Sequence, residues 1–278
     1  MFRICIDAGH YGYYNKSTVV TPTYWESKMT WKLHLLLKAE LERYAGVEVV
    51  TTREDQAKDL EVYTRGTRAK GCDLFLSLHS NDCSTPSVDR AEVIYPVSGK
   101  GKDLATELVA AIAACMQTND KTKIFCKWNS AGTADYYGVI RGAAAVGVPG
   151  LILEHSFHSN ARAAKWLQSD ENLAKLAKAE AAVIAAHYAL KPKELALPVL
   201  TDAFKEQMRL YRAGLQDNDA GDWSLEARQW AIDNGLVVGT GTLPDGSPNY
   251  AWEDFVTREQ LVTFLYRHQQ AKNRTQDA

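Results

Sequence analysis

The sequence predicts an α/β protein with a mostly parallel, twisted sheet flanked by helices, followed by a small helical C-terminal domain. In residues 1–190, short apolar runs rich in β-branched residues alternate with segments whose apolar residues recur at helical spacing. Residues 191–200 carry two prolines and no clear periodicity, and only helical patterns follow them. We therefore expect two domains joined by a linker at 191–200.

The first domain, residues 1–190, alternates expected strands and helices. Apolar runs bounded by turn residues predict strands at 2–7, 47–52, 72–80, 91–96 and 150–156. Leucines at 33, 36, 37 and 41 recur at helical spacing, and comparable patterns predict helices over 26–44, 60–72, 101–117 and 172–188. This order is typical of a sheet whose strands are largely parallel.

The C-terminal domain, residues 201–270, is expected to be helical and acidic. Helical patterns cover 202–213, 224–234 and 257–270, and residues 271–278 resemble a frayed tail. This domain holds six Lys or Arg against eleven Asp or Glu, a balance of -5. The chain as a whole has a formal net charge of -2, so the residues outside this domain carry a small positive balance of +3.

Composition and charge exclude several classes of function. A hydrophobic share of 46% and a charged share of 24% are those of a globular protein. The net charge of -2 provides no field for an anionic polymer, so we expect no nucleic-acid partner. No apolar run approaches the roughly 18 residues of a membrane span, so we expect no membrane partner.

The cysteines and the N-terminus indicate where the chain is made. Five cysteines without a CxxC pair favour reduced thiols and a reducing compartment. The segment MFRICIDAGH lacks the basic and long apolar regions of a signal peptide. We expect synthesis in the cytoplasm, with any action outside it depending on another route of release.

Two histidines and one glutamate stand where an α/β sheet places its functional residues. His10 follows the first expected strand and His79 ends the third, so both lie at carboxyl ends of strands. Glu26 opens the first helix, from which a carboxylate can turn inward. Catalytic zinc is held by three such side chains with one position left open. Taken singly, each has an alternative, because such histidines often only form hydrogen bonds and such glutamates favour the helix dipole.

Several motifs follow one another in the order of a known family. They are D-x-G-H in 6–10, a T-R segment followed by Asp55, two arginines at 65 and 68, S-x-H-x-N in 77–81, and a closing segment around Glu154 in 148–160. Over residues 2–188 this ordered set resembles the zinc-dependent N-acetylmuramoyl-L-alanine amidases of the Amidase_3 type. The resemblance implies a zinc ion held by His10, Glu26 and His79, with Glu154 as the essential carboxylate that is not a ligand.

The chemistry of amide hydrolysis agrees with that role for Glu154. The reaction needs a base that takes a proton from water and an acid that gives one to the leaving amine, and one glutamate beside a metal can do both in turn. Glu154 ends an apolar strand, so burial is expected to raise its pKa while zinc lowers it. The alternative is a carboxylate paired with an arginine such as Arg141.

Some residues near the motifs depart from the family's pattern. Tyr11, Tyr13 and Tyr14 stand where the family commonly has glycines, which predicts an aromatic rim and a reshaped substrate groove. His155 and His158 flank Glu154 at a spacing seen in zinc sites. The family has no ligand at either position, so we expect both to lie behind or beside the ligands.

Residues 224–261 carry a second resemblance. A helix, a glycine-containing turn and an aromatic residue followed by T-R-E-x-L resemble a single S-layer homology motif, a type of module that anchors proteins to the bacterial cell wall. This implies a wall-binding unit, with a secondary cell-wall polymer as a candidate ligand. The alternative is a helical cap or a homodimerisation unit, because Trp223, Trp230 and Trp252 could be buried against the unit itself or a partner.

Three functions are compatible with these residues. The first is hydrolysis of the amide bond between N-acetylmuramic acid and L-alanine in peptidoglycan by a phage or prophage endolysin, made in the host cytoplasm and acting on the wall after release. A bacterial autolysin would share this chemistry. The second is a zinc hydrolase of another amide or peptide. The third is a binding protein without catalysis, against which the retention of His10, Glu26, His79 and Glu154 argues.

Overall fold

The computed structural model describes residues 1–193, 201–215, 217–254, 256 and 258–276. The chain divides into two compact units, Met1–Leu195 and Ala196–Ala278, which we call the first and the second unit. Most of the expected linker, at 194–200, lies outside the described residues. Residues 191–193 bond to the first unit, since Ala45 N–H donates to Lys191 O and Lys193 N–H donates to Arg43 O.

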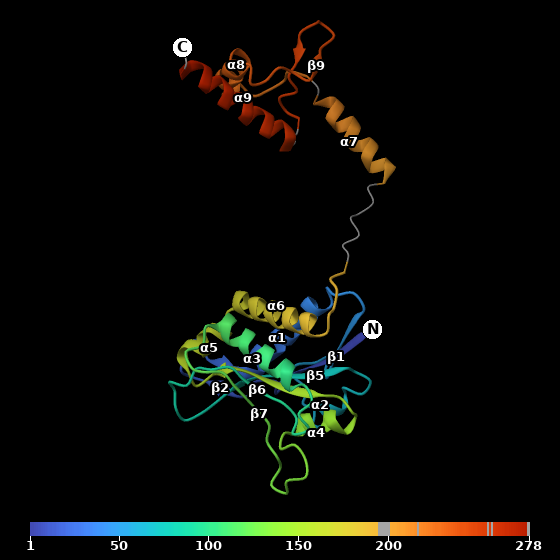
Figure 1. Ribbon diagram of the computed structural model, residues 1–278, viewed down its shortest axis with the longest axis vertical. Coiled ribbons are helices and arrows are strands. Elements are labelled where there is room, and N and C mark those ends of the chain that lie inside the picture. Colours follow the sequence, from blue (N-terminus) through green and yellow to red (C-terminus); the bar gives the residue numbers. More distant parts are fainter. Residues whose placement is uncertain (194–200, 216, 255, 257, 277–278) are drawn as a thin grey trace. The chain divides into compact units, whose positions relative to one another are not determined.

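The first unit contains the predicted α/β sheet (Figure 1). Its six strands lie in the order β4 (Val47–Thr51), β1 (Phe2–Ala8), β5 (Leu74–Asn81), β8 (Gly150–Phe157), β6 (Glu92–Ile94) and β7 (Lys123–Phe125). The pairings β1–β4, β1–β5, β5–β8 and β6–β7 are parallel, and β6–β8 is antiparallel. The prediction of an α/β fold with a mostly parallel sheet is therefore confirmed.

Helices cover both faces of this sheet (Figure 1). On one face lie α1 (Glu26–Leu41), α3 (Lys102–Met116) and α6 (Asp170–His187), and on the other α2 (Val62–Thr67) and α4 (Gly138–Ala145). Residues 74–78 of β5 are all buried, as expected for a central parallel strand that is covered on both faces. All five cysteines are free, two of them buried.

Several short elements of the first unit were not predicted. No strand or helix was expected over residues 118–147, where the structure has β7 and α4. The helix α5 (Ala161–Leu167) was not expected either, and it begins where the Asn160 side chain accepts a hydrogen bond from Ala163 N–H. A small hairpin of β2 (Lys16–Ser17) and β3 (Tyr24–Trp25) lies between β1 and α1 in sequence and leads directly into Glu26.

The described part of the second unit consists of helices and one small hairpin. It contains α7 (Asp202–Gly214), the 3-10 turn η1 (Asp222–Ser224), α8 (Leu225–Asp233), β9 (Gly241–Thr242), β10 (Pro248–Asn249) and α9 (Arg258–Gln276). The helix α9 continues into the segment 271–276 that resembled a tail. Within the described part of the chain, no helix combines the length and the apolar character needed to cross a membrane.

Candidate metal and catalytic site

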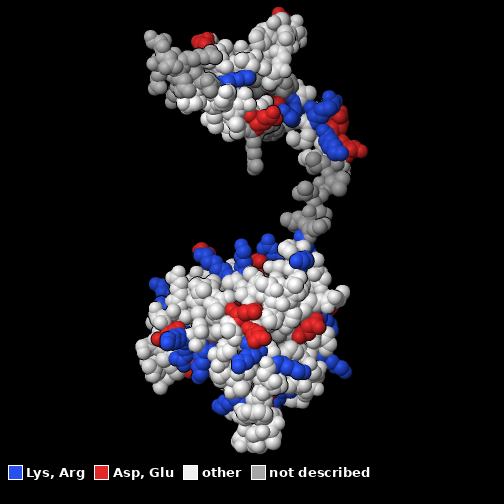
Figure 2. All heavy atoms as spheres, viewed as in Figure 1, with Lys and Arg blue, Asp and Glu red and all other residues white. Residues whose placement is uncertain are grey.

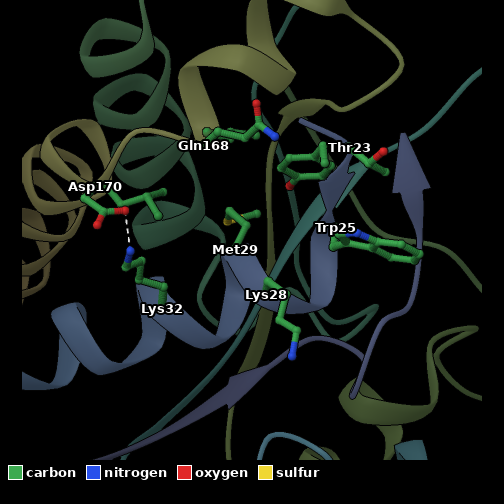
Figure 3. Close-up of a pocket in the computed structure, with 10 residues that line it drawn as sticks. Thr23, Trp25, Lys28, Met29, Lys32, Gln168 and Asp170 are labelled. Carbon is green, nitrogen blue, oxygen red and sulfur yellow. Dashed lines mark hydrogen bonds and ion pairs between the residues drawn. The ribbon is translucent and has the colours of Figure 1, made fainter. Parts of the chain in front are cut away.

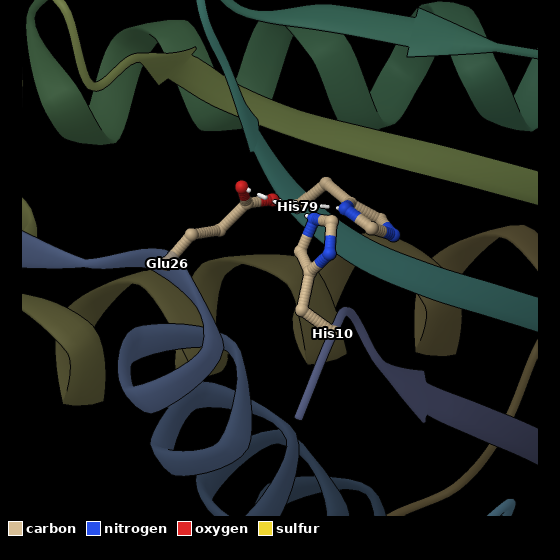
Figure 4. Close-up of side chains that lie close together, drawn as sticks. All are labelled: His10, Glu26 and His79. Atoms are coloured by element: carbon tan, nitrogen blue, oxygen red, sulfur yellow. Dashed lines mark hydrogen bonds and ion pairs between the residues drawn. The ribbon is translucent and has the colours of Figure 1, made fainter. Parts of the chain in front are cut away.

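Three predicted ligands come together at one edge of the sheet (Figure 4). His10 follows β1, Glu26 is the first residue of α1, and His79 lies near the end of β5. One ligand atom from each of the three lies within 4.8 Å of the others, and no other such group of His, Cys, Asp or Glu is found among the described residues. Glu26 bridges the two imidazoles, with Oε1 2.9 Å from His79 Nδ1 and Oε2 3.2 Å from His10 Nε2.

Local backbone geometry explains why the two histidines approach. A Cβ atom on Gly9 would lie 2.4 Å from Cε1 of His79, so only glycine fits before His10. His10 itself has a φ of 58°, in the left-handed region, which turns the chain sharply at the end of β1. The Gly9 carbonyl accepts a hydrogen bond of 2.7 Å from Thr30 Oγ1, which ties this turn to α1.

The charges of the three side chains are coupled. Burial opposes ionisation of Glu26, but hydrogen bonds from His10 and His79 outweigh it and hold the pKa of this carboxyl far below its usual range. Burial also opposes protonation of His79, but the hydrogen bond and the charge of Glu26 outweigh it and raise the pKa of His79 to about 9. The Glu26 carboxylate is thus kept ionised between two imidazoles. A cation bound there would displace protons from the imidazole nitrogens that face Glu26.

Neighbouring groups hold Glu26 in place. Asn15 Nδ2 donates to Glu26 Oε2 over 2.8 Å and also lies 3.1 Å from His10 Nε2. Ser80 N–H donates to Glu26 Oε1 over 3.0 Å. Asn15 and Ser80 were not identified as site residues from the sequence, although Ser80 lies inside the S-x-H-x-N motif.

The arginines of the motifs support the strand that leads to His10. Arg53 Nη2 and Arg65 Nη1 both donate to the carbonyl of Ala8, the last residue of β1. Asp7 is fully buried and accepts hydrogen bonds from Thr52 Oγ1 and Ser77 Oγ. These contacts assign the T-R and D-x-G-H motifs a structural role, which is to fix the turn that carries His10.

Glu154 lies beside His79, because the two residues are register partners on the neighbouring strands β8 and β5. Its Oε2 atom is buried and has no hydrogen-bond partner among the described residues. Burial raises the pKa of Glu154 to about 7, with the nearby positive charge of His79 acting in the opposite direction. The alternative pairing with Arg141 is not found, because Arg141 Nη1 donates to the carbonyls of Asp135 and Tyr136.

The two histidines that flank Glu154 lie outside the ligand group. His158 Nδ1 lies 3.0 Å from Ser80 Oγ and 3.9 Å from Glu26 Oε2, while its ring stacks on Tyr24 at 5.5 Å. His155 is fully buried and bonded at both ring nitrogens. Both histidines therefore contact residues next to the three candidate ligands, and neither belongs to the ligand group itself.

Comparison with known families identifies the first unit. Residues 4–186 match the family model of N-acetylmuramoyl-L-alanine amidases. The chain belongs to this family. Membership makes the protein a hydrolase of amide bonds that acts on peptidoglycan. A comparison with curated proteins finds no match.

Solved structures, two of which are of N-acetylmuramoyl-L-alanine amidases, share the fold of this amidase. The catalytic domain of CwlV from Bacillus (Paenibacillus) polymyxa var. colistinus is 23% identical with a TM-score of 0.58, covering 69% of this chain and 100% of that chain. AmiC2 of Nostoc punctiforme is 22% identical with a TM-score of 0.56, covering 68% and 97%. Cwp6 from Clostridium difficile is 24% identical with a TM-score of 0.59, covering 66% of this chain and 29% of that one.

Three exposed tyrosines follow His10 in the amidase, and two of them stack beside its ring. Tyr14 stacks on the His10 ring with centroids 4.9 Å apart, and Tyr11 stacks on Tyr14 at 5.9 Å. Tyr13 packs edge-on against Trp25 at 5.3 Å. Exposed aromatic faces next to a candidate ligand suit contact with a bulky substrate.

A surface pocket of about 290 Å³ lies at the start of α1 (Figure 3). Residues 23–32 line one side of it and residues 167–173 the other. Its charged side chains already have partners, because Lys32 pairs with Asp170 and Lys28 Nζ donates to Gln56 Oε1. The amidase therefore shows no unpaired charge for a substrate among the described side chains of this pocket.

The visible surface of the first unit is electrostatically mixed. Lys and Arg are interspersed with Asp and Glu on the face shown in Figure 2, with uncharged surface between them. This face therefore has no single dominant charge.

Proposed function

We propose that this protein is a zinc-dependent amidase that hydrolyses the bond between N-acetylmuramic acid and L-alanine in peptidoglycan. In this proposal His10, Glu26 and His79 hold the zinc and Glu154 acts as acid and base. One observation carries it: three donor atoms within 4.8 Å of one another lie next to a carboxyl that has a free buried oxygen.

The three donors fit zinc in type and number. Two imidazoles and one carboxylate are the ligand set of many catalytic zinc sites, which keep a fourth position for water or substrate. Glu26 is ionised and faces both histidines, so the donor atoms already converge. When bound there, zinc would supply a Lewis acid for the amide carbonyl and would acidify the attacking water.

Glu154 supplies the proton transfers. With a pKa of about 7, a large fraction of this carboxyl is ionised near neutral pH and its free oxygen can accept a proton from the attacking water. The water oxygen bonds to the amide carbon, and the same proton then passes from Glu154 to the leaving L-alanine nitrogen as the carbon–nitrogen bond breaks. The products are a lactyl carboxylic acid and the L-alanine amine, and Glu154 returns to its ionised state. The acid then gives up the second proton of the water to the amine or to solvent, which leaves a carboxylate.

The proposed mechanism is tested by Glu154→Gln, which keeps the volume and removes the base. We expect kcat on purified walls to fall by about 10²–10⁴-fold, with zinc content unchanged. Glu171→Gln is the matched control, because Glu171 is an exposed glutamate on α6 that pairs with Lys175. Walls are digested with chelator and after zinc is restored, and the new amino termini are identified.

The outcomes of this digestion separate the candidate functions. New L-alanine amino termini that depend on zinc support the proposal. Zinc-dependent cleavage of another amide would favour the broader hydrolase. A Glu154→Gln variant as active as the parent would overturn the assignment of Glu154, and activity that survives the chelator would exclude the zinc site.

The second unit is proposed to bind the cell wall, with a secondary wall polymer as its ligand. Support comes from a pocket of about 360 Å³, whose lining residues are Val237, Val238, Gly239, Thr240, Tyr250, Ala251, Trp252, Asp254, Val256, Glu259, Gln260, Thr263, Phe264 and Arg267. It contains the aromatic pair Tyr250 and Trp252, stacked at 5.2 Å, and such concave sites with aromatic walls are common ligand sites. Trp252→Ala in the full chain is expected to reduce sedimentation with walls while leaving cleavage of soluble muropeptides unchanged.

We also propose that the second unit associates with another copy of itself. Exposed apolar side chains occupy one face of α9, at Leu261, Val262, Leu265 and Tyr266. The residues of α9 on its other face, including Thr263 and Phe264, line the pocket of their own unit. The outer face is thus available for a partner.

The role as a phage or prophage endolysin, released to the wall from the host cytoplasm, stays a prediction from the sequence.

A further inference from the structure

The ladder between β5 and β8 is interrupted beside the candidate site. His79 is paired with Glu154, but the next pair joins Asn81 to Phe157, so two steps along β5 correspond to three along β8. Ser156 lies in this interruption with a φ of 61°, in the left-handed region. A bulge of this kind redirects side chains, and here it directly follows the pair of residues on which the proposed chemistry depends.

The side chain of His155 lies in this bulge and is bonded at both ring nitrogens. Its Nδ1 lies 2.7 Å from the backbone carbonyl oxygen of His79. Because a carbonyl only accepts hydrogen bonds, Nδ1 carries the proton and donates. Its Nε2 lies 2.6 Å from Oε1 of Glu180 on α6. The His155 ring therefore connects a buried glutamate of α6 to the backbone of a candidate zinc ligand.

Both partners are completely enclosed. His155 and Glu180 have no exposed surface. The second carboxyl oxygen of Glu180, Oε2, has no hydrogen-bond partner among the described residues, so this side chain is anchored through its bond to His155. Burying two ionisable groups in one pair is costly, and replacement by apolar residues often stabilises a protein. A contribution to stability therefore does not by itself explain why the chain has this buried pair.

We propose that His155 and Glu180 are positioning residues for the zinc site. Glu180 fixes the orientation of the His155 ring, and His155 fixes the backbone of His79 within the bulge. The His79 ring is thereby held toward Glu26, next to Glu154. Groups that orient a ligand typically change metal affinity or activity by about 10–100-fold when they are removed. This inference rests on the proposed zinc site.

Two substitutions at one position separate positioning from packing. In His155→Asn, the amide nitrogen replaces Nδ1 and can still donate to the His79 carbonyl, while the link to Glu180 is lost. In His155→Gln, the amide group replaces Nε2 and can still reach Glu180, while the bond to His79 is lost. His187→Gln is the control, because His187 forms a partly exposed pair with Glu107 through Nδ1 at 2.9 Å.

The affinity for zinc is measured on each folded full-length variant by competition with a chelator, together with the visible spectrum of the cobalt-substituted protein. We expect His155→Gln to bind zinc about 10–100-fold more weakly than the parent and to show an altered cobalt spectrum. His155→Asn, which keeps the bond to His79 and loses only the contact with Glu180, should bind zinc more weakly than the parent but more tightly than His155→Gln, and the control should bind zinc like the parent. If positioning is absent, both His155 variants lose thermal stability but bind zinc like the parent.

Substitutions at Glu180 keep the test decisive if the His155 variants fail to fold. Glu180→Gln keeps a hydrogen bond to the ring, and Glu180→Met has a similar volume without one. We expect only Glu180→Met to weaken zinc binding, and parent-like binding by it would overturn the inference. A parent protein that binds no zinc would instead overturn the proposed function itself, so the two failures are distinguishable.

Discussion

At the scale of single residues, the neighbourhood of Glu154 determines when it carries charge. Burial raises its pKa from 4.5 to about 7, although the positive charge of His79 opposes this shift. Between those two values the folded protein keeps a proton on Glu154 that the unfolded chain has released. Unfolding then releases a proton, so the contribution of this group to stability falls as the pH rises from about 4.5 to about 7.

This sign predicts a pH-dependent difference between the parent and Glu154→Gln, both freed of metal. Glutamine does not titrate, so the free energy of unfolding of the parent should fall relative to that of the variant between about pH 4.5 and pH 7. A shift of this size corresponds to a decline on the order of 3 kcal/mol, since one pKa unit is about 1.4 kcal/mol. Urea unfolding at several pH values measures it, and parallel curves for the two proteins would contradict the raised pKa.

The convergence of His10, Glu26 and His79 could be expected from sequence, because each lies at a strand end or a helix start and the ordered motifs resemble one family. Asn15 could not be predicted in the same way, because its amide meets Glu26 only after the β2–β3 hairpin has folded back. Glu180 lies on a helix 25 residues beyond His155, and nothing local marks it as a site residue. Such supporting contacts depend on tertiary packing, and sequence periodicity gives information only on local secondary structure.

At the scale of elements, α2 and α4 form one unusually close pair. A Cβ atom on Gly142 of α4 would lie 2.0 Å from the carbonyl oxygen of Tyr63 on α2, and one on Gly66 would lie 2.1 Å from that of Val139. The helix α2 also carries Arg65, which donates to the end of β1. The closeness of these two helices therefore supports the turn before His10.

Gly142→Ala is expected to destabilise the first unit by about 1–3 kcal/mol, because the added methyl meets backbone that no rotamer change can move. In an open helix the same substitution would stabilise by up to about 1 kcal/mol. Gly214→Ala provides that comparison, since a Cβ at the last residue of α7 has nothing within 4 Å. Thermal unfolding of the full chain checks both, and equal melting temperatures for Gly142→Ala and the parent would disprove the close packing.

The same contact explains why α4 was not predicted. Its sequence, GVIRGAAA, is short and contains two glycines, which weaken any helical pattern. Those glycines allow α2 to approach closely. The same two residues therefore weaken the helical pattern in the sequence and make the close packing of α4 possible. By contrast, long elements such as α1 and α6 were predicted from their periodic leucine and alanine residues, apart from their ends.

At the scale of the whole molecule, the two units differ in how much of their surface they bury. The first unit has two apolar clusters, one on each side of its sheet. Among the described side chains of the second unit, only Leu236, Asn249 and Ala251 are buried, and Trp223 is 93% exposed. A unit of this size with so small a core is marginally stable alone. A partner that covers its apolar residues would supply the missing burial.

Leu265→Glu tests whether that partner is a second copy of the chain. Leu265 is 60% exposed in the centre of the apolar face of α9, and a charge buried there in an interface would be left without a partner. We expect sedimentation of the full chain to show an associated parent and a dissociation constant raised by about 100-fold in the variant, or about 2.8 kcal/mol. Leu35→Glu, at a 48% exposed leucine on α1, should change nothing. A parent that sediments as a monomer would mean that wall polymer or the first unit covers this face, and adding walls or cleaving the linker would then distinguish between those two.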